Sequence, residues 1–289
     1  MTLFVLFLLV IPVLILYAVG YRLDNFYSVI STGGIFVSTE QSGVLIRVDN
    51  TLEKWSNLFQ RSFLLSSLKA GNHSVVVTKD GYVTWTKTVP VFAEKVTQIN
   101  PFLVPKEITL IPVNKYLLPN DSNILATSTK ELLLVKNKVI NPEYEIASQL
   151  FVATRTKPVI NQENLDRFVG VKEIVVKQKT ALWKENDKLL VHWLGATSSA
   201  PYYFCVFELC GREVLISTPS GIKYFDFYPG RNDLVLYVTS LGMYISEIDN
   251  RGSAQNLFPL VLEAGVTFRV SEDENIYVKT SQGLFRLDL

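Results

Sequence analysis

The chain has 289 residues, with 28 Lys and Arg against 27 Asp and Glu and a formal net charge of +1. Nucleic-acid-binding proteins normally present a basic face, so this balance argues against that class. Hydrophobic residues make up 48% of the chain, which excludes a disordered protein. Two Cys and two His are too few for a structural zinc site, and we expect neither a metal nor a cofactor.

The first segment, Leu3–Val19, carries no charged residue and is close to the short limit of a bilayer-spanning helix. Pro12 lies in its middle, where it would break a helix of a soluble core but is tolerated in a membrane helix. Tyr17 and Tyr21 stand at one end, as in the aromatic belt of a membrane protein. We therefore interpret residues 1–21 as a transmembrane signal anchor.

Two other interpretations of this segment remain open. The sequence Ala18-Val19-Gly20 fits the small residues that precede a signal-peptide cleavage site. A buried globular helix is the third interpretation, although such a helix normally keeps a polar face. The only nearby basic residue, Arg22, follows the apolar run, so charge gives no clean orientation. We expect residues 22–31 to be a polar linker and the bulk of the chain to be extracytoplasmic.

A period-two pattern follows and predicts a small antiparallel β domain over residues 32–105. Ile35 and Val37 alternate with Phe36 and Ser38, and Val75 and Val77 follow Gly71 at the same spacing of two. Trp85 faces away from its threonine neighbours, which we predict to lie on the solvated face. Asp80-Gly81 predicts a hairpin turn, because glycine supplies a positive φ angle at low cost.

Four strings of this region resemble the PEGA domain family: Gly34–Ser38, Gly43–Asn50, Leu65–Val77 and Lys79–Trp85. They follow the family pattern of a strand ending in Ser, a Gly-containing turn, then Leu-x-x-Gly-x-His-x-Val and Lys-x-Gly-Tyr. Gln41–Val44 stands where the family has Pro-Glu-Gly-Ala. The resemblance implies a small all-β module of prokaryotic surface proteins that binds or links other molecules and has no catalytic activity.

Short apolar runs separated by turn residues continue through residues 106–289 and predict a second all-β domain. Only Asn161–Val169 shows a brief helical pattern. The predicted strands are Ile124–Ala126, Leu132–Val135, Glu173–Lys177, Leu189–Trp193, Tyr202–Phe207, Val214–Ile216, Leu234–Val238 and Ile276–Lys279.

A faint internal repeat runs through this second domain. Thr239–Tyr244 is echoed by Thr280–Phe285, 41 residues later, and Asp121–Asn123 with Thr127–Thr129 resembles a third copy. A period of about 40 to 45 residues is that of a four-stranded propeller blade. The region resembles the β-propeller superfamily in its period alone, with room for only about four blades. A partial propeller and a β-sandwich are therefore both open.

Few residues are candidates for chemistry. In one continuous strand, Cys205 and Cys210 would point to opposite faces. A disulfide between them therefore needs an intervening turn. We expect instead two small buried thiols. We predict that the His73 ring packs beside Tyr82 or Trp85 while one ring nitrogen meets a backbone carbonyl, and that His192 belongs to a core or strand surface. Glu272–Glu274 lacks the spaced ligands of a calcium loop and predicts a solvated hairpin turn.

An aromatic face is the better candidate for a ligand site. In an extended strand Tyr224, Asp226 and Tyr228 share one face, and Phe225 and Phe227 share the other. The phenylalanine face suits a core. Two tyrosines and a carboxylate suit a sugar ring or a peptide, although tyrosines packed at a sheet edge would give the same pattern.

The sequence thus predicts an all-β ectodomain on one N-terminal transmembrane helix, with a small antiparallel β domain followed by a propeller-like one. We expect a non-catalytic binding or scaffolding protein of the prokaryotic cell envelope. Its expected partners are the lipid bilayer and a cell-surface glycan or protein, and not nucleic acid. The alternatives are the ectodomain of a sensor or envelope assembly factor, or an enzyme that acts on glycans with carboxylates paired in space.

Overall fold

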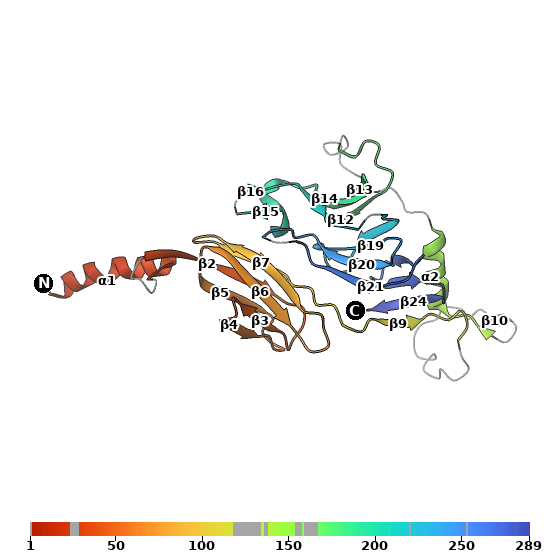
Figure 1. Cartoon of the computed structure of the whole chain (residues 1–289), viewed down its shortest axis with the longest axis horizontal. Coiled ribbons are helices and arrows are strands. Elements are labelled where there is room, and N and C mark those ends of the chain that lie inside the picture. The colour runs from red at the N-terminus through yellow and green to blue at the C-terminus, as the bar shows by residue number, and fades with distance from the viewer. Residues whose placement is uncertain are drawn as a thin grey trace. The chain divides into compact units, whose positions relative to one another are not determined.

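Two compact units make up the structure (Figure 1). The computed structural model describes residues 2–23, 29–117, 134–135, 138–153, 158, 167–207, 209–219, 221–252 and 254–289. Its secondary structure is mostly strand, which confirms the predicted all-β class. Unit 1 comprises Met1–Lys106, Ala196–Arg212 and Asp249–Asn256, and unit 2 comprises Glu107–Gly195, Glu213–Ile248 and Leu257–Leu289. Two segments from late in the sequence therefore belong to the unit that begins the chain.

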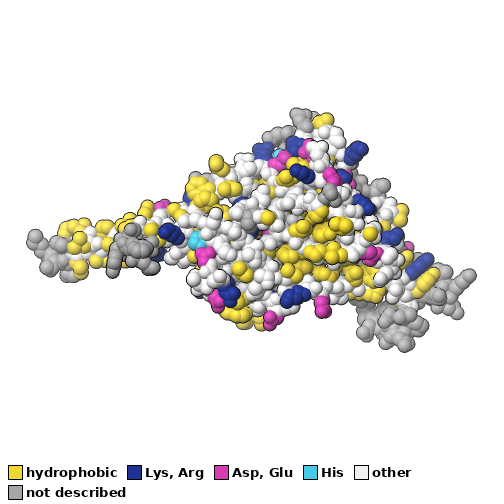
Figure 2. Space-filling view, viewed as in Figure 1, with side chains coloured by type: hydrophobic (Ala, Val, Ile, Leu, Met, Phe, Trp, Pro, Cys, Tyr) yellow, Lys and Arg dark blue, Asp and Glu magenta, His cyan; other side chains and the backbone are white. Residues whose placement is uncertain are grey.

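The N-terminal helix α1 (Thr2–Val19) contains Pro12 and no charged residue. Its described side chains are largely exposed, among them Phe4 at 67% and Tyr17 at 62%, and they give it an apolar surface (Figure 2). Among the residues whose placement is described, no helix is both long and apolar enough to cross a membrane. Arg22 Nη1 donates a 2.6 Å hydrogen bond to the carbonyl oxygen of Tyr17, near the C-terminal end of the helix.

Two four-stranded sheets form the β-sandwich of unit 1. The strands of the first sheet are β1 (Tyr21–Leu23), β2 (Val29–Ser38), β5 (Ser62–Lys69) and β8 (Val96–Ile99). Those of the second sheet, in spatial order, are β4 (Leu52–Trp55), β3 (Leu45–Val48), β6 (Gly71–Thr78) and β7 (Trp85–Val91). The pairing is antiparallel as predicted, except that β2 and β8 are parallel. Arg22 and Leu23 of β1 and the first residues of β2 lie in the stretch expected to be a linker, whereas Tyr21 lies in the expected anchor.

Alternation of side chains gives each of these sheets one buried face. Ile35 and Val37 on β2 are 0% exposed, as are Val75 and Val77 on β6. Trp85 on β7 is 1% exposed, whereas its threonine neighbours at positions 84 and 86 are exposed, as the pattern predicted. The predicted turn before β7 has Gly81 at a φ angle of 79°. Because both sheets bury one face within one compact unit, we assign a single core between them.

Unit 2 contains three four-stranded antiparallel sheets, a two-stranded sheet and a helix among its described residues. The first sheet consists of β12 (Ile174–Lys177), β13 (Thr180–Glu185), β14 (Lys188–Trp193) and β17 (Glu213–Ile216). The second consists of β18 (Tyr224–Phe227), β19 (Leu234–Val238), β20 (Met243–Glu247) and β21 (Leu257–Val261). The third consists of β22 (Thr267–Val270), β23 (Ile276–Lys279), β24 (Leu284–Asp288) and β9 (Thr109–Pro112). The two-stranded sheet consists of β10 (Leu134–Val135) and β11 (Lys138–Val139).

The internal repeat forms the same turn in the second and third sheets. The Thr239 amide donates to the Gly242 carbonyl at 2.9 Å, and the Thr280 amide donates to the Gly283 carbonyl at 2.9 Å. Both glycines have positive φ angles, of 152° and 146°. The equivalent sequences therefore occupy equivalent places, between β19 and β20 and between β23 and β24. The third copy, at residues 121–129, lies outside the described residues.

The expected propeller is not confirmed. Each four-stranded sheet formed by the described residues is open, and none of them closes on itself. Neighbouring sheets meet through β18, which contacts β12 and β13 of the first sheet and β22 of the third. Strand β9, from the start of unit 2, pairs with β24 at the end of the chain.

The helix α2 (Pro142–Val152) corrects the prediction that only Asn161–Val169 is helical. Its start carries ordinary signals: Asn141 accepts a 3.0 Å hydrogen bond from the Glu143 amide, and proline follows that cap. Residues 161–166 and the predicted strand at 124–126 lie outside the described part of the chain.

Candidate functional site

A buried lysine on the inner side of β7 attaches a distant segment to the sheet of unit 1. Lys87 follows Trp85 on the buried face and is 2% exposed. Its Nζ donates a 2.5 Å hydrogen bond to the main-chain carbonyl of Asp249 and lies 3.8 Å from the Oδ2 atom of that residue. Because an ammonium group is costly to bury without partners, these contacts fix Asp249 beside β7.

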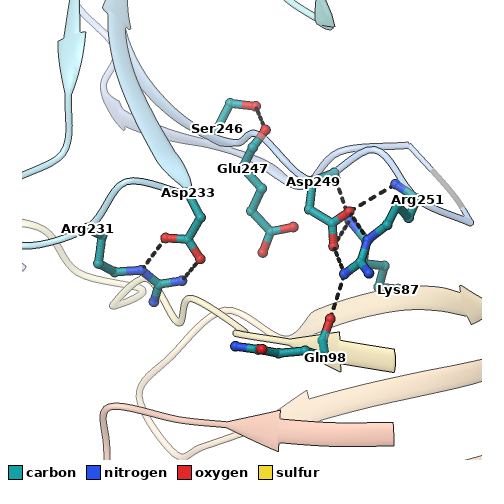
Figure 3. A network of polar contacts seen from close by, with 8 residues as sticks. All are labelled: Lys87, Gln98, Arg231, Asp233, Ser246, Glu247, Asp249 and Arg251. Carbon is teal, nitrogen blue, oxygen red and sulfur yellow. Dashed lines mark hydrogen bonds and ion pairs between the residues drawn. The ribbon is translucent and has the colours of Figure 1, made fainter. Parts of the chain in front are cut away.

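Arg251 completes this network (Figure 3). Its Nε and Nη2 atoms donate to Asp249 Oδ1 and Oδ2 at 2.8 and 3.0 Å, the paired geometry that a guanidinium and a carboxylate favour. Nη2 also donates to the carbonyl of Gln98 on β8 at 2.5 Å. Its Cζ lies 4.9 Å from the ring centroid of Tyr202, which belongs to the other late segment of unit 1. Arg251 lies in one late segment of unit 1 and therefore links it to β8 and to the other late segment.

Gly252 allows segment 249–256 to approach the edge of β7. Its φ angle is 75°, and a Cβ atom at this position would lie 2.1 Å from the carbonyl oxygen of Thr88. Such a distance is far inside van der Waals contact, so only glycine fits this backbone.

The second late segment, 196–212, forms a small hairpin that a disulfide closes. It contains the short helices η3 (Thr197–Ser199) and η4 (Tyr202–Phe204), followed by strands β15 (Cys205–Val206) and β16 (Leu209–Cys210). Cys205 and Cys210 stand opposite each other in this ladder and are disulfide-bonded. The prediction of two buried thiols is wrong, and so is that of a continuous strand over 202–207. The chain turns at Phe207, whose φ angle is 60°.

We call residues 205–210 the apolar hairpin, because its described side chains outside the disulfide are apolar and exposed. Val206 is 54% exposed, Phe207 52% and Leu209 81%. Figure 2 shows apolar side chains at the surface in this part of unit 1. On one side the Phe207 ring lies 5.0 Å from that of Phe92, and Lys95 Nζ lies 5.8 Å from the Phe207 centroid.

A groove of about 250 Å³ separates the hairpin from the strand edge beside it. Its lining combines aromatic, aliphatic and cationic side chains, including Phe92, Lys95, Val96, Tyr202, Phe207 and Arg251. The described residues contain no group of three His, Cys, Asp or Glu side chains placed to hold a metal ion. What the lining offers is apolar contact beside a positive charge, which suits binding of an amphipathic molecule.

Comparison with known proteins identifies part of this unit. Residues 60–107 match the PEGA domain. The match spans β5, β6, β7 and β8, and so includes Lys87, Lys95 and Gln98. The earlier strings of the resemblance, Gly34–Ser38 and Gly43–Asn50, precede the matched range. No curated protein matches the chain.

The predicted ligand residues lie in unit 2, on and just after β18. Phe225 and Phe227 are buried, as the alternation predicted, whereas Tyr224 and Asp226 are half-buried. The Tyr224 ring packs edge-on against Phe268 at 4.9 Å, and Arg269 Cζ lies 4.0 Å from its centroid. Asp226 Oδ1 accepts a 2.8 Å hydrogen bond from the next main-chain amide. The main-chain carbonyl of Tyr228 accepts a 3.0 Å hydrogen bond from Lys177 Nζ. A sugar or peptide ligand at these residues stays a prediction.

The histidines contact neighbouring residues of their own units. His73 Nε2 lies 2.7 Å from the Lys69 carbonyl, as predicted for one ring nitrogen, and Nδ1 lies 2.5 Å from Asp49 Oδ2. Burial alone would raise the pKa of Asp49, but hydrogen bonds from His73 and from the Ser74 amide outweigh it, so this pKa is below its ordinary value. His192 is buried beside the rings of Phe168 and Trp183 in unit 2.

Sequence reasoning missed the network of Lys87 and Arg251, although one signal was present. Lys87 occupies an inward position of an alternating strand, and a lysine there requires a buried partner. Nothing local in the sequence marks Asp249 or Arg251 as that partner.

Proposed function

We propose that this chain is a membrane-anchored, extracytoplasmic binding or scaffolding protein of the prokaryotic cell envelope, with no catalytic role. In this proposal α1 is the membrane segment and the unit that carries the PEGA match is the binding module. Supporting observations are the uncharged, apolar surface of α1 and its direct connection to the β-sandwich of unit 1. Its 18 residues correspond to about 27 Å of helix, and a bilayer adapts to a short segment by local thinning.

The observation that carries the location is the Cys205–Cys210 disulfide. Disulfides persist in oxidising compartments such as the periplasm and the cell surface, and they are rare in the reducing cytosol. The hairpin that it closes is exposed at the surface of unit 1, so cellular reductants would reach it. A disulfide at this exposed place supports an extracytoplasmic location.

We further propose that unit 2 is an incomplete β-propeller with the three four-stranded sheets as blades. The repeated Thr–Gly turns and the contacts of β18 with both neighbouring sheets support this arrangement. The pairing of β9 with β24 brings the two ends of unit 2 together, as ring-closing strands do. An experimental density map with the three sheets arranged about one axis would support it, and two sheets packed face to face would contradict it.

Thiol labelling of the full chain in a bacterium with a periplasm tests the proposed location. The membrane fraction should retain the chain after carbonate washing, and protease added to spheroplasts should digest it. A membrane-impermeant maleimide should label the two cysteines only after a reductant is added. Cys205→Ser is the control, because it frees Cys210 and should permit labelling without reductant. Protection from protease together with free thiols would place the chain in the cytosol and overturn the proposal.

A further inference from the structure

We propose that the apolar hairpin 205–210 is a second membrane contact, which lies in the headgroup region of the bilayer beside the end of α1. This inference rests on the proposed function, because it takes α1 to be the membrane segment. It adds a specific surface of unit 1 that touches phospholipid. Three features of unit 1 support it: the exposure of the hairpin, its position relative to α1, and the charges around it.

The hairpin exposes more apolar surface than its own folding requires. Val206, Phe207 and Leu209 are all more than half exposed, within a loop that the disulfide holds closed. Tyr203 and Phe204, just before the loop, are buried at 3% and 5% and fix its base. Three exposed apolar side chains so near one another are typical of an interaction site, because they cost solvation free energy while they face water.

Hydrogen bonds place this hairpin at the end of unit 1 where α1 joins it. The Thr32 amide on β2 donates to the carbonyl of Gly20, the residue after α1, at 3.0 Å. The Thr32 carbonyl in turn accepts from the Glu94 amide at 2.8 Å. Glu94 lies in the turn that carries Phe92, and Phe92 packs against Phe207. The path from the helix end to the hairpin thus crosses two main-chain hydrogen bonds and one aromatic contact, all within unit 1.

Two cations lie near this path, together with the exposed carboxylate of Glu94. Lys95 lies beside the Phe207 ring, and Arg22 Cζ lies 3.7 Å from the Tyr17 centroid at the end of α1. Lysine and arginine place their charged ends near lipid phosphates while their stems cover apolar surface, and aromatic rings favour the same depth. The chain has a net charge of only +1, so apolar contact would dominate and these two cations would orient the surface.

A second exposed apolar group in unit 1 provides a matched control. Leu58 and Phe59 are 71% and 98% exposed, in a turn that Asn57 Oδ1 stabilises by accepting from the Phe59 amide at 2.9 Å. This turn precedes β5, whose first residue pairs with Ser38 at the far end of β2. Between Thr32 and Ser38 the strand rises about 20 Å. The Leu58–Phe59 turn is therefore too far from the end of α1 to reach the same interface.

Fluorescence quenching of the full chain in liposomes tests the proposal. The variants Phe207→Trp and Phe59→Trp are each reconstituted in phosphatidylcholine vesicles with and without brominated acyl chains, and emission is compared with that of the parent chain. The emission of each variant in excess of the parent chain comes from the new tryptophan. Brominated lipid should quench most of this excess in Phe207→Trp and little of it in Phe59→Trp. Mass spectrometry confirms the disulfide in each variant, and circular dichroism confirms the fold.

The outcomes separate this inference from the proposed function. If the parent chain does not float with liposomes, α1 is not a membrane segment and the proposed function fails. If it floats but brominated lipid does not quench the emission added by Phe207→Trp, the second contact alone is overturned. A third result is that neither aqueous acrylamide nor brominated lipid quenches this emission. Protein would then cover the hairpin, and this result also overturns the proposal.

Discussion

The ammonium group of Lys87 on β7 donates a 2.5 Å hydrogen bond to the main-chain carbonyl of Asp249. The two residues are 162 positions apart in the sequence, and both are buried within unit 1. Arg251 holds the carboxylate of the same aspartate. The β-sandwich that carries the PEGA match is thereby joined to a segment that follows β20.

Replacing this lysine should destabilise unit 1. Lys87→Met keeps most of the side-chain volume but leaves the Asp249 carbonyl and part of its carboxylate without a cation. Because Arg251 still pairs with Asp249, we expect a loss of about 2 kcal/mol in the free energy of unfolding. Urea denaturation followed by tryptophan fluorescence measures it. Lys54→Met, on an exposed position of β4, should change stability by less than about 0.5 kcal/mol. Equal effects of the two substitutions would contradict the role of Lys87.

Gly252→Ala should displace the segment that crosses the edge of β7. The new Cβ atom would meet the Thr88 carbonyl at 2.1 Å, so the backbone must move. Gly265→Ala is the matched control. The φ angle of Gly265 is 82°, close to the 75° of Gly252, but no atom lies within 4 Å of a Cβ added at Gly265. The control should cost about 1 kcal/mol from backbone strain alone. Gly252→Ala should cost clearly more and speed hydrogen exchange at Arg251. A cost equal to that of the control would show that the close approach does not restrict residue 252.

Acid should weaken unit 1 partly through Asp49. Its pKa is lowered in the folded protein from an ordinary value of 3.8, so its contribution to stability is present above that value. The contribution is lost as the pH falls below about 4 and through the folded-state pKa. Asp49→Asn should therefore flatten the decline of the urea midpoint in this range and cost at most about 0.5 kcal/mol at pH 7, because solvent screens a side chain that is 42% exposed. An unaltered slope in Asp49→Asn would refute the assignment.

Removing the hydroxyl group of Tyr237 should stabilise unit 2. The residue is 0% exposed, and within the described structure its hydroxyl has no hydrogen-bond partner. Burial raises its pKa well above the ordinary range, so the phenol stays protonated. Tyr237→Phe keeps the stacking on Tyr244, whose ring lies 5.7 Å away, and should raise the free energy of unfolding by about 1 kcal/mol. Tyr277→Phe removes a 3.4 Å bond to Glu143 and should not stabilise. A loss of stability in Tyr237→Phe would reveal a partner for that hydroxyl.

Local patterns predicted the strands well. The predicted runs Leu234–Val238 and Ile276–Lys279 coincide with β19 and β23. The repeat of Thr239 and Thr280 identified two turns with the same hydrogen bond. These features depend on the period of the side chains and on glycine conformations, and a sequence displays both directly.

Other features were missed although local signals existed. Cys205 and Cys210 would point to opposite faces only in one continuous strand. The chain instead turns at Phe207, and the two cysteines stand opposite each other. The start of α2 carries Asn141 and a proline after it, and Tyr144, Ala147 and Phe151 recur at helical spacing on its packed side.

By itself the sequence determined the all-β class, the positions of strands such as β14, β19 and β23, and the apolar, uncharged nature of the N-terminal segment. Only the tertiary structure decided that residues 196–212 and 249–256 belong to unit 1, that the two cysteines are bonded, and that Lys87 and Arg251 converge on Asp249. The physical reason is that periodicity tells which face of a strand is buried but not which distant segment covers it. That choice depends on where long connections close in space, and no short stretch of sequence records it.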